Sequence, residues 1–203
     1  MEIVIYTQRV EVVENYQERR DCADQRIADF ITACGFLPIA LPNREGLAEC
    51  MIEKLKPVGI LLTGGNSLVS KGGNAPERDA MDHILIRLSI QYNIPLYGFC
   101  RGMQSILHYF GNQLEEVEGH VAVRHIIDRK KKSYEVNSYH TQACRKLECN
   151  SGLYCEAHTI DGVIEAVRHK EFSIIGTMWH PERERSFREE DIKMVKDLFS
   201  TNI

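Results

Sequence analysis

The pattern of apolar and polar positions along the first half of the chain predicts strands that alternate with helices. Short apolar runs that end in turns predict strands at residues 3–6, 36–41, 58–62, 94–96 and, much later, 172–176. Segments with apolar side chains at helical spacing predict helices at residues 17–34, 45–55, 76–92, 103–110 and 187–199. Residues 7–16 are predicted to be a polar connection.

From Gly111 onward the pattern changes to strands separated by turn signals such as Asp161-Gly162. These strands are predicted at residues 121–127, 134–137, 153–158 and 163–167. The alternating first half predicts an α/β fold with three layers (α/β/α) and a mostly parallel central sheet, to which short antiparallel strands are added. In such sheets sites gather at the carboxyl ends of the strands, where Cys100, Gly65 and the loop after Tyr6 all fall.

Composition narrows the class of protein. The chain has 203 residues, 43% of them hydrophobic, and a net charge of −4, which predicts one domain over residues 1–203. Without a basic block or a long apolar run, we expect no nucleic-acid partner, no membrane association and no leader segment. Seven cysteines without regular spacing indicate reduced thiols and a cytoplasmic protein.

Cys100 lies in a Gly-x-Cys-x-Gly pattern between a predicted strand and a predicted helix. A nucleophile in such a sharp turn needs glycine on both sides, because the chain passes close to itself there. The start of a helix also favours thiolate over thiol. We therefore predict that Cys100 is a catalytic nucleophile; the alternative is a small buried cysteine in a tight turn.

His180 and Glu182 follow another predicted strand and flank Pro181. A carboxylate held against one imidazole nitrogen leaves the other nitrogen to act on a thiol, so the pair has the form of a base and its orienting partner. Gly65, in the turn after the strand at 58–62, and Arg101 have backbone amides that are predicted to bind an oxyanion. A surface His-Pro-Glu loop and an ordinary strand-ending turn are the alternatives.

Four segments in order resemble the class I glutamine amidotransferase family and its γ-glutamyl hydrolase relatives. They are Thr-Gly-Gly at 63–65, Gly-Phe-Cys-Arg-Gly-Met-Gln at 98–104, Val-Asn-Ser-Tyr-His-Thr-Gln at 136–142 and Trp-His-Pro-Glu at 179–182. The resemblance implies a flavodoxin-like fold with Cys100 as nucleophile, His180 as base and Glu182 as its partner. It also implies that Gln104, Ser138 and Tyr139 hold a glutamyl group and that His140 lies among the substrate contacts.

The resemblance implies cleavage of a γ-glutamyl amide through a thioester on Cys100, with a small-molecule substrate, no cofactor and no metal. In an amidotransferase the leaving group is ammonia, and this chain would need a partner synthetase. The form of the segment at 136–142 favours the hydrolase branch, and the whole chain resembles hydrolases that release a nucleotide amidate in bacterial capsule synthesis. A thiol sensor or chaperone on a related fold is the non-enzymatic alternative, and a homodimer is one option for assembly.

A charged leaving group would need cations near Cys100. Arg9, Arg19 and Arg20 follow the first strand, and Arg101 adjoins the nucleophile. We predict that at least one of Arg9, Arg19 and Arg20 faces the Cys100 cleft and binds an anionic leaving group. The alternative is that Arg19 and Arg20 pair with acidic neighbours on an exposed helix.

Other cysteines and histidines give weaker signals. Cys144, Cys149, Cys155 and His158 lack the Cys-x-x-Cys spacing of a structural zinc site, so we expect no zinc there. The cysteines in predicted helices, Cys22, Cys34 and Cys50, are expected in or near the core. His120 and His125 flank a strand near the predicted site and are either substrate contacts or structural. The basic run Arg129-Lys130-Lys131-Lys132 is predicted to be a solvated hairpin turn.

Overall fold

Parallel and antiparallel strands share one large sheet in the computed structural model, which describes residues 1–129 and 132–200. Its strands are β1 (Ile3–Tyr6), β4 (Leu37–Ala40), β5 (Gly59–Leu62), β6 (Leu96–Phe99), β8 (Val121–Arg129), β9 (Lys132–Tyr139), β11 (Leu153–Thr159), β12 (Ile164–His169) and β13 (Ile174–Thr177). Two small ribbons are formed by β2 (Arg9–Val13) with β3 (Glu18–Cys22), and by β7 (Glu115–Glu116) with β10 (Gln142–Ala143).

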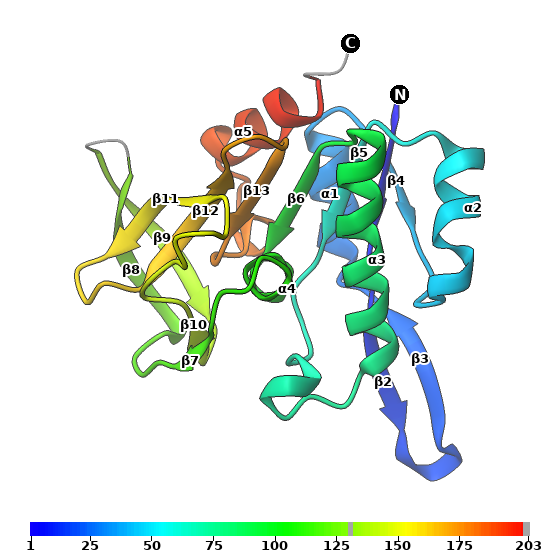
Figure 1. Cartoon of the computed structure of the whole chain (residues 1–203), viewed down its shortest axis with the longest axis horizontal. Coiled ribbons are helices and arrows are strands. Elements are labelled where there is room, and N and C mark those ends of the chain that lie inside the picture. Colours follow the sequence, from blue (N-terminus) through cyan, green and yellow to red (C-terminus); the bar gives the residue numbers. More distant parts are fainter. Residues whose placement is uncertain (130–131, 201–203) are drawn as a thin grey trace.

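The helices are α1 (Gln25–Ala33), α2 (Glu45–Leu55), α3 (Pro76–Tyr92), α4 (Arg101–Tyr109) and α5 (Glu189–Phe199). Short 3-10 turns occur at Glu14–Tyr16, Val69–Lys71 and Pro181–Arg183. In the described residues the large sheet has nine strands in the order β4-β1-β5-β6-β13-β12-β11-β8-β9 (Figure 1). The first five run parallel, and from β12 onward each neighbour is antiparallel.

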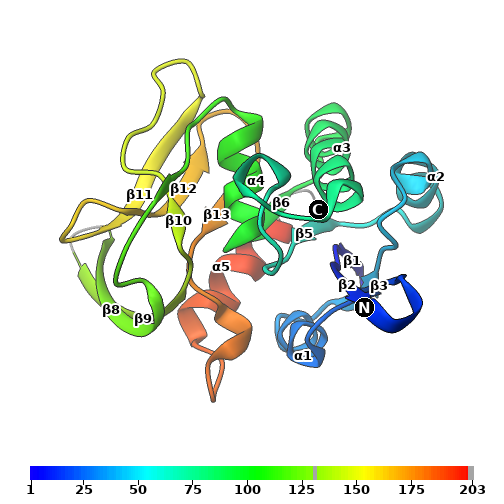
Figure 2. The ribbon, with the colours of Figure 1, turned by 90° about the horizontal axis from the view of Figure 1, so that it is seen from below.

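Helices cover both faces of the parallel strands, with α2, α3 and α4 on one side and α1 and α5 on the other (Figure 2). Successive side chains of a strand point to opposite faces of the sheet, so one short apolar strand packs against the helices on both faces. Ile60 and Leu62 belong to the core cluster that includes side chains of α2, α3 and α4, whereas Leu61 between them packs in the cluster of α1 and α5. The predicted α/β fold with its parallel centre is confirmed.

The segment at residues 7–34 differs from the prediction. Residues 7–16 are not a polar connection, and the helix begins at Gln25 rather than at 17, because a β2–β3 hairpin occupies the space between (Figure 1). Val10 is buried in β2 while Arg9 and Glu11 are exposed, which is the alternation of a strand. The side chain of Asp24 accepts a hydrogen bond from the Arg26 amide and caps α1 at this later start.

Two predicted helical cysteines are also placed differently. Cys22 ends β3, and Cys50 is exposed on α2, whereas Cys34 is buried as predicted. All seven cysteines lie in the described part of the chain and are unpaired.

The added antiparallel strands are not short. β8, β9 and β11 have nine, eight and seven residues, against four in each parallel strand. They extend the main sheet because β12 pairs antiparallel with β13 at its edge. The basic run at residues 129–132 lies between β8 and β9, which pair at Arg129 and Lys132, and the residues of its predicted hairpin turn, 130–131, lie outside the described residues. No helix in the described ranges has the length and apolar character needed to cross a membrane.

Two glycine substitutions test the packing of the sheet. A Cβ on Gly59 would lie 2.4 Å from the ring of Phe199 in α5, whereas a Cβ on Gly46 in α2 meets nothing within 4 Å. Gly59→Ala should lower the free energy of unfolding by about 1–3 kcal/mol through overpacking. Gly46→Ala should leave it unchanged or raise it by up to about 1 kcal/mol through helix propensity. Urea unfolding monitored by circular dichroism measures both, and equal values would contradict the packing described here.

Candidate active site

The predicted site residues converge at the carboxyl ends of the parallel strands. Cys100 follows β6, Gly64 and Gly65 follow β5, and His180 comes three residues after β13. A pocket of about 310 Å³ at this edge is lined by Gly65, Cys100, Arg101 and His180 together with the segment at 139–142. The order of the strands in the sheet therefore brings together chain segments that are far apart in sequence.

Cys100 has a strained backbone, with φ = +50° and ψ = −112°. Side-chain-bearing residues rarely adopt this conformation, and it persists only where surrounding contacts hold it. The Cys100 amide donates a 2.7 Å hydrogen bond to the Thr177 carbonyl of β13. A Cβ on Gly102 would lie 2.1 Å from the Leu62 carbonyl oxygen, and one on Gly98 would lie 2.7 Å from the Gly102 backbone. Gly98 is thus required where β6 packs against α4, and Gly102 is required where α4 packs against β5.

His180 is held at both its side chain and its backbone. Its Nδ1 lies 2.7 Å from Glu182 Oε1, and both side chains are buried. Asn137 receives a hydrogen bond from the His180 amide at 2.9 Å and donates one to its carbonyl at 2.8 Å. Asn137 is a positioning residue that we did not single out from the sequence, although it lies inside the segment at 136–142. The Arg26 side chain donates to the Glu182 carbonyl at 2.7 Å and braces the turn.

Burial lowers the pKa of His180, but the negative charge of nearby Cys100 and the contact with Glu182 outweigh it and raise that pKa to about 9. An imidazole with this pKa is protonated near neutral pH. This arrangement can supply a thiolate nucleophile and a proton for a leaving group from one pair of side chains. Gly64 gives His180 room, because a Cβ there would lie 2.8 Å from His180 Cε1.

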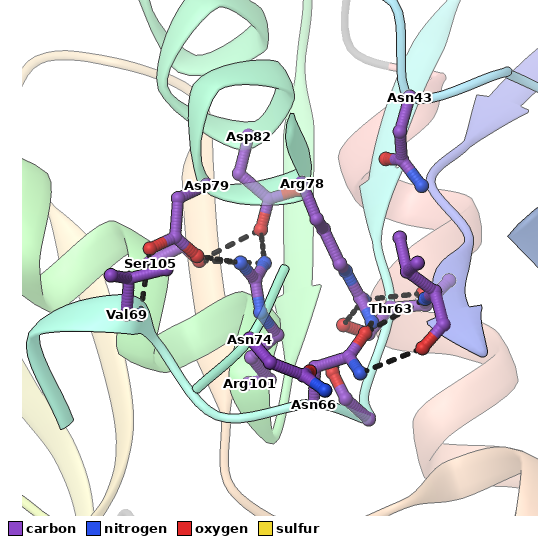
Figure 3. Close-up of polar contacts among 12 residues, drawn as sticks. Asn43, Thr63, Asn66, Val69, Asn74, Arg78, Asp79, Asp82, Arg101 and Ser105 are labelled. Carbon is purple, nitrogen blue, oxygen red and sulfur yellow. Dashed lines mark hydrogen bonds and ion pairs between the residues drawn. The ribbon is translucent and has the colours of Figure 1, made fainter. Parts of the chain in front are cut away.

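Buried Arg78 of α3 fixes the turn that contains Gly65 (Figure 3). Its guanidinium donates to the carbonyl oxygens of Thr63 at 2.6 Å, Gly64 at 3.0 Å and Gly65 at 2.5 Å. In a trans peptide the carbonyl and the following N–H point in opposite directions. The Gly64 carbonyl faces Arg78, so the Gly65 N–H points away from Arg78, as an oxyanion donor requires.

The same helix α3 also anchors Arg101. The Arg101 side chain, 1% exposed, forms ion pairs with Asp79 and Asp82 of α3 and a 3.2 Å hydrogen bond to Ser105 (Figure 3). It is therefore turned into the protein, and only its backbone amide at the start of α4 is left as a donor to a ligand. The predicted use of Arg101 through its backbone fits this placement, but its guanidinium does not serve as a cation for a leaving group.

Of the residues predicted to contact a glutamyl group, some line the pocket and one has its side chain engaged elsewhere. Gln104 lines the pocket, and its amide nitrogen donates to the Gln142 carbonyl at 2.8 Å. The Ser138 hydroxyl is buried and donates to the His120 carbonyl at 2.7 Å, so its side chain is already engaged away from the pocket.

Tyr139 and His140 line the same pocket as Cys100. The Tyr139 ring lies edge-on to His180, with ring centroids 5.5 Å apart. Arg183 stacks over Tyr139 at 4.5 Å and also lines the pocket, a placement that the sequence pattern did not predict. Its position directly after the Trp-His-Pro-Glu segment is the only signal in the sequence.

The three arginines of the β2–β3 hairpin lie in different surroundings. Arg9 lines a hollow of about 20 Å³ with Gly65, His180 and Arg183, and its guanidinium also pairs with Glu11 at 2.7 Å. Arg19 pairs with Glu77 at 2.6 Å, and Arg20 pairs with Glu18 at 2.9 Å on an exposed strand rather than on a helix. Of these three, Arg9 is the one that the structure places at the site.

Comparison with known proteins agrees with the geometry. The family model for "Glutamine amidotransferase class-I" matches residues 13–201, and the chain belongs to this family. It is 31% identical to the γ-glutamyl-CDP-amidate hydrolase of Campylobacter jejuni, over 96% of each chain. It is 29% identical to a γ-glutamyl-γ-aminobutyrate hydrolase of Escherichia coli O157:H7, over 78% of this chain and 77% of that one.

Among solved structures, a putative GMP synthase subunit of Thermoplasma acidophilum superposes with a TM-score of 0.72. The match covers 98% of this chain and 93% of the other at 16% identity, which shows a shared fold.

Glu182→Gln tests the pairing that raises the His180 pKa. Wild-type kcat/KM on a γ-glutamyl amide should fall as pH rises through about 9, where His180 loses its proton. Without the carboxylate the His180 pKa drops, so this alkaline limb should move to lower pH, and kcat should fall by about 10²–10⁴-fold. Glu171→Gln, an exposed carboxylate, is the control. A Glu182→Gln profile that coincides with the wild type would rule out Glu182 as the partner of His180.

Arg78→Lys tests the orientation of the Gly65 turn. Lysine keeps the charge but cannot reach three carbonyl oxygens with a planar fork. Misorienting one oxyanion donor should lower kcat by up to about 10²–10³-fold with a smaller change in KM. Arg87→Lys, on an exposed position of the same helix, should be silent. Circular dichroism checks folding, and a folded Arg78→Lys protein with wild-type kcat would contradict the role of Arg78.

Proposed function

We propose that the protein is a cysteine hydrolase that cleaves a γ-glutamyl amide. The Cys100 thiolate attacks the δ-carbonyl carbon, the Gly65 and Arg101 amides bind the resulting oxyanion, and His180 donates its proton to the departing nitrogen as the C–N bond breaks. Water then attacks the γ-glutamyl thioester, and glutamate leaves as the thiol is regenerated. The observation that carries this proposal is the strained Cys100 beside a His180 whose pKa is raised to about 9.

Gln104, the backbone of Ser138 and the Tyr139 ring are the groups we assign to the amino and carboxylate ends of the glutamyl moiety. They surround the same pocket as Cys100, or adjoin it in the case of Ser138. His140 contributes to the wall of that pocket. Arg183, stacked on Tyr139, adds a positive charge at this wall and suits a carboxylate or a phosphate.

For the leaving group, we propose a cytidine diphosphate amidate. The similarity to the Campylobacter jejuni enzyme over nearly the full length of both chains supports this substrate, γ-glutamyl-CDP-amidate. Arg183 lines the pocket of about 310 Å³ that contains Cys100, and Arg9 lines an adjoining hollow of about 20 Å³. A diphosphate in the larger pocket would be bound by these two guanidinium groups at its edge, whereas ammonia needs none. The products would be glutamate and cytidine diphosphoramidate, in capsule phosphoramidate synthesis.

The second candidate is the glutaminase component of an amidotransferase, which would pass ammonia to a partner synthetase. The family match itself favours it, since the family is that of the class I amidotransferases. A non-enzymatic thiol sensor is a third candidate, but it has no need of the His180–Glu182 pair. The unpaired cysteines support a cytoplasmic location. A homodimer remains a prediction.

One assay with two substrates separates the candidates. Glutamate release should have a much higher kcat/KM with γ-glutamyl-CDP-amidate than with L-glutamine. Arg9→Ala should raise KM for the nucleotide substrate by about tenfold or more, as loss of a charge-assisted contact predicts, and should leave glutamine hydrolysis unchanged. Arg20→Ala is the matched control, because Arg20 pairs with Glu18 away from the site.

Other outcomes of this assay have distinct meanings. Preference for glutamine would contradict the nucleotide substrate and favour the amidotransferase candidate. An equal effect of Arg9→Ala on both substrates would show that Arg9 does not recognise the leaving group.

A further inference from the structure

Three buried side chains from the antiparallel half of the sheet converge behind the pocket wall. His120 precedes β8, His140 follows β9, and Glu165 lies in β12. Their side chains are 4%, 2% and 0% exposed, and one possible metal-ligand atom from each lies within 4.8 Å of those from the other two. They differ from the cysteine set considered in the sequence, so spacing alone gave no hint of them.

The distances match those of a metal site. His140 Nε2 and His120 Nδ1 lie 3.2 Å and 3.5 Å from the same oxygen, Oε1 of Glu165. Ligands of a tetrahedral zinc ion, at about 2.0–2.2 Å from the metal, lie about 3.4 Å from one another. Two of the three ligand separations are therefore close to the value that a zinc ion imposes, and the shorter one, between His140 and Glu165, is a hydrogen bond in the structure.

Hydrogen bonding within the cluster is incomplete. His120 Nδ1 and Glu165 Oε2 are buried without a hydrogen-bond partner among the described residues. A third imidazole, His125, approaches the same Oε1 at 3.5 Å, and its Nε2 is likewise unpaired. One carboxylate oxygen cannot serve three imidazoles well, whereas a cation bound between His120, His140 and Glu165 would use the free electron pairs.

A second carboxylate supports His120 from behind. His120 Nε2 lies 3.2 Å from Asp161 Oδ2, and Asp161 is itself held by Thr159 and Arg145. A metal-binding histidine typically donates its other N–H to a carboxylate, which fixes the tautomer and leaves the first nitrogen for the metal. Asp161 provides this partner for metal binding through His120 Nδ1.

We propose that His120, His140 and Glu165 bind one zinc ion, with water as the fourth ligand and His125 at the rim. Two imidazoles and a carboxylate suit Zn²⁺ better than Mg²⁺ or Ca²⁺. The ion would join β12 to the ends of β8 and β9. His140 borders the pocket, so the ion would stiffen the segment that carries Tyr139. The ion takes no part in the proposed chemistry at Cys100, so a protein without zinc binding would still be consistent with the proposed hydrolase.

The test uses the full chain with Cys100→Ala, so that metal bound by the nucleophile is not counted. After removal of metal with a chelator, titration with Zn²⁺ should give one site per chain and raise the melting temperature. Co²⁺ in the same protein should show the visible bands of a tetrahedral site without thiolate charge-transfer bands. A protein that binds no Zn²⁺ stoichiometrically, or binds Co²⁺ through thiolate, would overturn the proposal.

Variants assign the ligands. His120→Ala should abolish binding, and Asp161→Asn, at an exposed position, should weaken it by about 10–100-fold. His158→Ala, an exposed histidine on β11, should leave it unchanged. If His120→Ala fails to fold, the Asp161→Asn titration decides: unchanged affinity there would overturn the assignment.

Discussion

The site depends on one close crossing, where the chain leaves β6, turns at Cys100 and enters α4 against β5. Gly102 contacts the Leu62 carbonyl so closely that no side chain fits, and Cys100 adopts a conformation that costs on the order of 1–3 kcal/mol. The hydrogen bond from its amide to Thr177 ties that conformation to β13, which also leads to His180. This hydrogen bond therefore fixes Cys100 in relation to the strand that leads to His180.

Two buried arginines hold the backbone around Gly65 and Arg101. Arg78 and Arg101 are 0% and 1% exposed, and burying a guanidinium group is costly unless it is paired and hydrogen-bonded. The Nε atom of each has no hydrogen-bond partner among the described residues, so their other donors carry these contacts. Arg78 binds three backbone carbonyls, while Asp79 and Asp82 bind Arg101, so the first turns of α3 orient the backbone at both Gly65 and Arg101. Because loss of one member would leave a charge unpaired, we infer that this network preserves geometry rather than adding net stability.

Much of this arrangement could be predicted from the sequence, because the relevant signals are local. The alternation of strands and helices gave the α/β fold, and the Gly-x-Cys-x-Gly and His-Pro-Glu segments pointed to the residues that the structure brings together. The β2–β3 hairpin was missed, since polar residues such as Arg19 and Arg20 fit an exposed strand as well as a helix. The Asp24 cap was the available signal for the true helix start.

Long-range contacts were beyond sequence reasoning. Arg78 looks like an ordinary helix arginine until the fold places it under the turn at residues 63–65, and Asn137 gains its role only when β9 meets the His180 segment. The inward direction of the Arg101 side chain was equally invisible. Local pattern indicates which residue types are present, whereas tertiary packing decides where they point.

The measurement that tests the central claim most directly is the capture of the acyl-enzyme. Wild-type protein is mixed with excess γ-glutamyl substrate, quenched in acid during turnover, and analysed by intact mass and peptide mapping. The account predicts a γ-glutamyl adduct on Cys100 alone, and γ-glutamyl hydroxamate as a product when hydroxylamine is present. Steady glutamate release with neither adduct nor hydroxamate, or with an adduct on another residue, would contradict thioester catalysis at Cys100.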